Sequence, residues 1–121
     1  MVDDYLRNLL KQTLDSYELL NQLKDKPGDL ETIKRELGKI RGLVQVIANN
    51  IERSGDTSDT YTELLDMSKA YLIDYDFTRA IEDVSGLYSE DPHRIKNMRL
   101  SIISSLEESE LIFKIQSILR E

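Results

Sequence analysis

The segment that decides the fold is residues 30–51, LETIKRELGKIRGLVQVIANNI. Apolar side chains recur in it at alternating intervals of three and four residues, at Leu30, Ile33, Leu37, Ile40, Val44, Ile47 and Ile51. This repeat places them on one face of an α-helix, whereas the side chains of a strand alternate at every second residue. Asp29 directly precedes the repeat, where its carboxylate can cap the first free backbone N–H groups. The sequence therefore predicts a helix to about Arg53, roughly 35 Å long.

Length and composition predict one helical domain that covers residues 1–121. Hydrophobic residues make up 40% of the chain and charged residues 32%, a balance that suits helices better than sheets. The absence of cysteine excludes disulfides and thiolate chemistry. No apolar run approaches the roughly 18–20 residues of a membrane span, and the acidic N-terminus does not resemble a signal peptide. We therefore expect a cytoplasmic protein without a membrane partner.

The first helix is predicted from Asp3 to about Lys24, with Asp3 or Asp4 as its cap. Pro27 and Gly28 end it, because proline lacks the N–H donor and glycine tolerates a left-handed turn. The loop that remains is short. The first two helices should therefore form an antiparallel hairpin.

Three further boundaries follow from capping patterns. Thr60 and Glu63 form a capping box, which predicts a third helix from Tyr61. Asp76 can cap a fourth helix after a break or kink, although the third helix could also continue unbroken. A clear boundary covers residues 85–92, where aspartate followed by proline at 91–92 predicts the start of the last helix. The predicted fold is an all-α, antiparallel bundle of four to six helices.

The C-terminal segment carries apolar residues on two opposite sides of a helix. The first set is Ile95, Met98, Ile102 and Leu106, and the second is Leu111, Ile112, Ile115 and Leu119. Either the helix breaks near Ser104 and the second set folds back onto the bundle, or a continuous helix presents the second set to a partner. The second alternative predicts a homodimer through these C-terminal residues.

Two glycines interrupt the second helix at Gly38 and Gly42, where each costs up to about 1 kcal/mol relative to alanine. With Val46 and Asn49 they form a smooth stripe on the side away from the apolar repeat. Close approach of another backbone would explain this stripe, and tolerated surface glycine is the alternative. The stripe is the second predicted site of partner binding.

Basic residues gather in two groups, at Lys34, Arg35, Lys39 and Arg41 and at His93, Arg94, Lys96 and Arg99. Most lysines and arginines along a helix are solvated or paired with acids. The second group opens a helix, whose N-terminus favours anions. It is therefore the predicted anion-binding site.

The sequence contains no catalytic constellation. His93 is the single histidine, and no serine lies in a nucleophile elbow. Glu63 and Asp66 share a helix face, as paired carboxylates do in all-α nucleotide hydrolases, but no acidic partner motif precedes them. We expect no metal site and no cofactor.

The favoured function is a protein–protein interaction module, an adaptor or export-chaperone-like subunit that self-associates. An accessory subunit of a nucleoprotein complex is the second hypothesis, although a net charge of −7 disfavours nucleic acid as a partner. A magnesium-dependent nucleotide hydrolase is the third. The sequence does not identify the protein partner.

Overall fold

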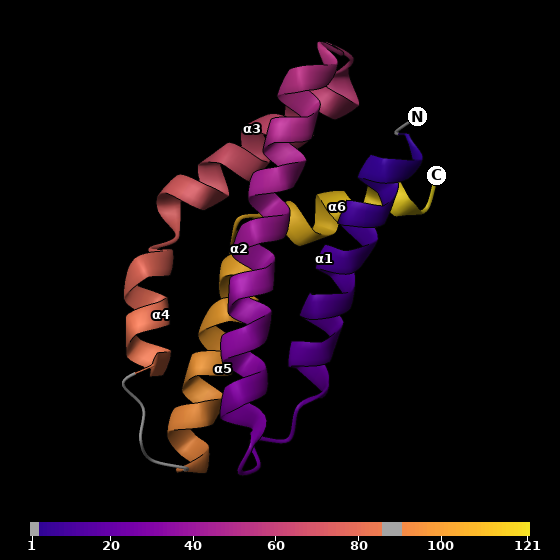
Figure 1. Ribbon diagram of the computed structural model, residues 1–121. Helices are drawn as coiled ribbons and strands as arrows, with labels where there is room; N and C mark the ends of the chain where they lie inside the picture. The colour runs from indigo at the N-terminus through magenta and orange to yellow at the C-terminus, as the bar shows by residue number, and fades with distance from the viewer. Residues whose placement is uncertain (1–2, 86–90) are drawn as a thin grey trace.

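The computed structural model describes residues 3–85 and 91–121 of the chain. Within these residues the backbone forms six helices and no strand, which confirms the predicted all-α class (Figure 1). The helices are α1 (Asp4–Gln22), α2 (Asp29–Ser54), α3 (Asp59–Asp74), α4 (Phe77–Ser85), α5 (Pro92–Glu108) and α6 (Leu111–Leu119). None of these helices is long and apolar enough to cross a membrane.

Four of the helices, α1, α3, α4 and α5, pack against α2. α1 and α2 lie side by side in opposite directions, and α3 and α4 then return along α2 (Figure 1). α5 reverses again, so that it runs in the same direction as α2 and packs against it. α6 instead lies across the other helices, where it contacts α1, α3 and α5. The last helix therefore crosses the bundle, and the end of α2 and the start of α3 extend beyond it (Figure 1).

The caps of the first two helices follow the sequence only in part. Asp3 caps α1 as predicted, since its carboxylate accepts a hydrogen bond from the backbone N–H of Leu6 at 2.8 Å. The predicted cap at Asp29 is wrong, because Asp29 is the first residue of α2 and its carboxylate accepts from the N–H of Lys26. Gly28 precedes α2 with a φ of 97°, a left-handed conformation that suits glycine because it has no Cβ.

The middle of the chain also differs slightly from the prediction. α3 begins at Asp59, so the predicted start at Tyr61 is wrong by two residues, and Ser58 stands at the cap position. The break between α3 and α4 is confirmed: the carboxylate of Asp76 accepts from the N–H of Arg79 at 3.0 Å.

The start of α5 matches the sequence. Pro92 is its first residue, and the carboxylate of Asp91 accepts from the N–H of His93 at 3.0 Å. The rest of the predicted boundary at residues 85–90 lies largely outside the described residues.

The C-terminal segment does not form one continuous helix. α5 ends at Glu108, and Glu110 adopts a left-handed conformation with a φ of 63°. α5 thus ends four residues beyond the break considered at Ser104, and the turn at Glu110 sends α6 back across the bundle. The alternative in which the second apolar set folds back onto its own bundle is therefore the one observed.

Side chains of all six helices form one hydrophobic cluster. The apolar repeat of α2 lies at its centre, with Ile33, Leu37, Ile40 and Val44 all 0% exposed. α4 contributes Phe77 and Ala80. Since a fully buried aliphatic side chain adds about 1.5–3 kcal/mol of transfer free energy, this repeat is a major source of stability.

Candidate functional site

The apolar face of α6 is not available to a partner. Leu111, Ile112 and Ile115 are at most 1% exposed, and Leu119 is half-buried. The prediction that these four residues form an exposed interface is wrong, because the turn at Glu110 places them in the chain's own core. A dimer through this face would require α6 to leave the bundle.

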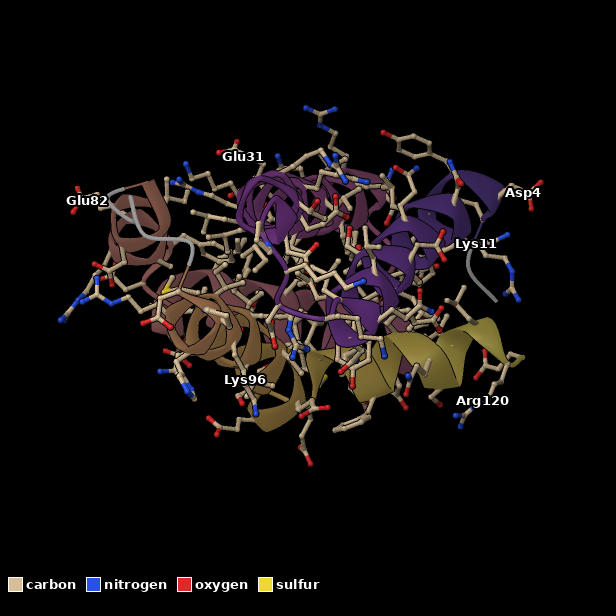
Figure 2. All side chains as sticks on the ribbon, turned by 90° about the horizontal axis from the view of Figure 1, so that it is seen from below. Asp4, Lys11, Glu31, Glu82, Lys96 and Arg120 are labelled. Carbon is tan, nitrogen blue, oxygen red and sulfur yellow. The ribbon has the colours of Figure 1, made fainter. Side chains whose placement is uncertain are left out.

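The predicted anion-binding group is divided between the surface and the interior. His93, Arg94 and Lys96 are exposed on α5, and Lys96 extends outward in Figure 2. Arg99 is only 9% exposed, so its inclusion in a surface site is wrong. The carboxylate of Asp91 already accepts from the N–H of His93 in the first turn of α5.

Arg99 instead joins three segments of the chain. Its Nε donates to Oδ1 of Asp25 at 2.7 Å and its Nη2 to Oδ2 at 3.1 Å, which makes a bidentate pair. Its Nη1 donates to the backbone oxygen of Leu20 near the end of α1 at 3.1 Å. The hydrogen bond from Arg99 to Asp25 raises the pKa of the guanidinium. Arg99 thus connects α5 to the end of α1 and to its loop.

A second buried charge lies between α1 and α2. Glu36 is 1% exposed and accepts a hydrogen bond from the hydroxyl of Ser16 at 2.8 Å and from Nε of Arg35 at 3.0 Å. Burial alone would raise the pKa of Glu36. The hydrogen bonds from Arg35 and Ser16, together with the charge of Lys39, outweigh burial and hold that pKa below its ordinary value. We did not predict this site, although Glu36 directly precedes Leu37 of the apolar repeat.

Aromatic rings fill the bend between α3 and α4. The rings of Tyr71 and Tyr75 stack at 5.7 Å between centroids, and Phe77 meets both edge-on at 5.5 and 4.8 Å. The guanidinium of Arg41 lies 6.0 Å from the Phe77 ring, which links the bend to α2. Burial raises the pKa of Tyr71, whose hydroxyl bonds that of Ser105 at 2.8 Å.

Three depressions open around Tyr75, with volumes of about 260, 490 and 320 Å³. Their walls carry carboxylates and hydroxyls, and the largest also includes Arg41. In the described residues no group of three or more histidine, aspartate or glutamate side chains is placed to hold a metal ion. Glu63, one of the predicted carboxylate pair, forms an ion pair with Lys114 of α6.

The side of α2 opposite the core is exposed along its whole length. We call it the outer face, and its residues are Glu31, Arg35, Gly38, Gly42, Val46, Asn49 and Arg53, all exposed. In the part of the chain that the structure describes, no atom beyond the chain neighbours and the adjacent backbone of α2 itself lies within 4 Å of a Cβ placed at Gly38 or Gly42. Val46 is 38% exposed although it is apolar. Figure 2 shows Glu31 directed away from the other helices, so α2 forms one edge of the molecule.

The outer face brings together Gly38, Gly42 and Val46, three of the residues predicted to bind a partner. Within the described chain no contact accounts for the two glycines. No family model matches the chain, and neither a curated protein nor a solved structure is detectably similar to it.

Proposed function

We propose that this chain is a cytoplasmic, non-catalytic protein–protein interaction module, an adaptor or export-chaperone-like subunit built as an antiparallel helical bundle. The observation that supports this function is that the outer face of α2 is exposed along the helix. The inner face of the same helix is buried in the hydrophobic core and cannot bind a partner. The outer face has a second helical pattern of small, apolar and charged residues that the described fold leaves exposed.

The glycines have an energetic cost that the monomer does not recover. Each destabilises an exposed helix interior by up to about 1 kcal/mol relative to alanine. Their Cβ positions are open, so steric crowding within the described chain does not require glycine. The distance between packed helices is set by the side chains at their contact, and glycine permits the closest approach. A helix docked on Gly38 and Gly42 would therefore account for both residues.

Differential affinity capture tests this function. The wild-type chain, Gly42→Arg and the control Ser117→Arg are compared as baits in extract from the source organism, after circular dichroism shows that all are folded. Ser117 is exposed on α6, so the control adds the same side chain to another helix surface. We expect a protein captured by the wild type and the control to be lost with Gly42→Arg. Identical captures by all three baits would contradict the proposal.

A further inference from the structure

We infer that the outer face of α2 binds the same face of a second copy of this chain, with the two α2 helices antiparallel and Gly42 at the two-fold axis. This inference rests on the proposed function and identifies the partner. Glycine alone does not identify a partner, because small residues only permit close approach. The evidence for a second copy is the arrangement of charge about Gly42.

The outer face is symmetric in its spacing. Its other six residues lie four, seven and eleven positions before and after Gly42. At about 100° per residue, all seven fall within roughly 40° of one line along α2. Two such helices that meet antiparallel at Gly42 bring each residue opposite the one at the same distance on the other side of Gly42. The geometry therefore defines four kinds of pair.

The central pairs are sterically complementary. Gly42 meets Gly42 of the second copy, so neither backbone is held away by a side chain. Val46 meets Gly38 of the second copy, where the missing side chain leaves space for the valine. Val46 would then bury apolar surface that is exposed in the single chain.

The outer pairs are complementary in hydrogen bonding and charge. Arg35 meets Asn49 of the second copy, whose amide oxygen has a second lone pair besides the one that accepts from Gln45. Glu31 meets Arg53 of the second copy, and symmetry provides this ion pair twice. Within the chain Glu31 pairs with Lys34 at 3.3 Å and Arg35 pairs with Glu36 at 3.0 Å. The side chains of Glu31 and Arg35 nevertheless remain 78% and 63% exposed, so both are accessible from outside the chain.

The same charges exclude a parallel pair in register. That arrangement would place Glu31 opposite Glu31, Arg35 opposite Arg35 and Arg53 opposite Arg53. Like charges that face each other destabilise a helix pair. Only the antiparallel arrangement converts these contacts into attractive ones.

The interface is small. Only one helix of 26 residues from each copy takes part, and contacts that bury less than roughly 1,200 Å² are typical of weak, transient complexes. The expected dimer is therefore weak and reversible, with a dissociation constant on the order of 10–100 µM.

Sedimentation equilibrium of the full chain between about 10 and 500 µM spans this range. We expect reversible dimerisation of the wild type. Glu31→Arg and Arg53→Glu, each alone, place like charges together at both ends and should weaken the dimer about tenfold. An equimolar mixture of the two variants restores both ion pairs, so it should form a heterodimer at close to wild-type strength. If the mixture of the two variants forms no heterodimer, the antiparallel geometry is overturned.

Gly42→Arg tests the steric part of the interface, with Ser117→Arg as its matched control. We expect a folded monomer for Gly42→Arg and an unchanged dimer for the control. A wild type that stays monomeric at about 500 µM, or a dimer that Gly42→Arg leaves intact, would overturn the inference. If the wild type is monomeric but Gly42→Arg still loses its partner in affinity capture, the interaction module stands with a different partner. If capture is also unaffected, both proposals fail.

Discussion

Arg99 shows how strongly the role of a single residue depends on its neighbours. Its side chain and that of Asp25 are 11% and 13% exposed, and the two form a bidentate pair. Arg99→Ala would leave the Asp25 carboxylate and the Leu20 carbonyl without this donor, which should cost about 3 kcal/mol of unfolding free energy. Urea denaturation measures the loss, and Arg94→Ala on the exposed side of α5 is the control. A loss of unfolding free energy below about 1 kcal/mol is typical of exposed ion pairs, and it would contradict a stabilising role for the buried Arg99–Asp25 pair.

Glu36 predicts a dependence of stability on pH. Its pKa in the folded chain is lowered, so the folded state binds its proton less readily than the unfolded state. The resulting stabilisation is present above the unfolded pKa of about 4.3 and is lost as pH falls through the folded pKa. Glu36→Gln should therefore reduce the fall in unfolding free energy on acidification from about pH 5 to pH 3.

Urea denaturation at several pH values measures this slope. Glu18→Gln, which removes an exposed carboxylate from α1, is the control for the change in charge. Equal slopes for the wild type and Glu36→Gln would contradict the assignment of this contribution to Glu36.

Gly42 lies inside α2 and Gly55 follows its last residue, and neither has a neighbour among the described residues within 4 Å of an added Cβ. Alanine is nevertheless expected to change the unfolding free energy in opposite directions at the two positions. Gly42→Ala lies in the helix interior, where alanine should raise the unfolding free energy by up to about 1 kcal/mol. Gly55 has a φ of 66°, and alanine there should lower it by about 1–2 kcal/mol through steric strain. Thermal melts at low micromolar concentration, where the proposed dimer is dissociated, give the sign of each shift. Destabilisation by Gly42→Ala would show that an unseen contact occupies the glycine.

The whole molecule depends on α6 as a part of its core. Ile115 is fully buried, so Ile115→Ala should destabilise the fold by about 2–5 kcal/mol through lost burial and a cavity. Phe113 lies on the same helix but is 49% exposed, and Phe113→Ala should cost much less. Chemical denaturation compares the two losses. If Ile115→Ala left stability unchanged and instead altered the oligomeric state, α6 would belong to an interface after all.

The sequence by itself determined the helical class and several boundaries. The apolar repeat of α2, the break at Pro27 and Gly28 and the start of α5 at Pro92 all depend on short-range geometry. A helical period or a missing N–H acts within a few residues. These features could therefore be predicted without knowledge of the rest of the chain.

The tertiary structure alone decided which faces are buried. Arg99 and Asp25 are 74 positions apart, and their pairing depends on the paths of α1 and α5. The direction of α6 depends on the left-handed turn at Glu110, a conformation that a glutamate does not signal in sequence because it is rare for residues with a Cβ. Periodicity shows that a helix has an apolar face, but burial of that face is a property of the packed chain. For this reason the apolar residues of α6, predicted to form an interface, lie in the core, whereas the glycines of α2 remain exposed.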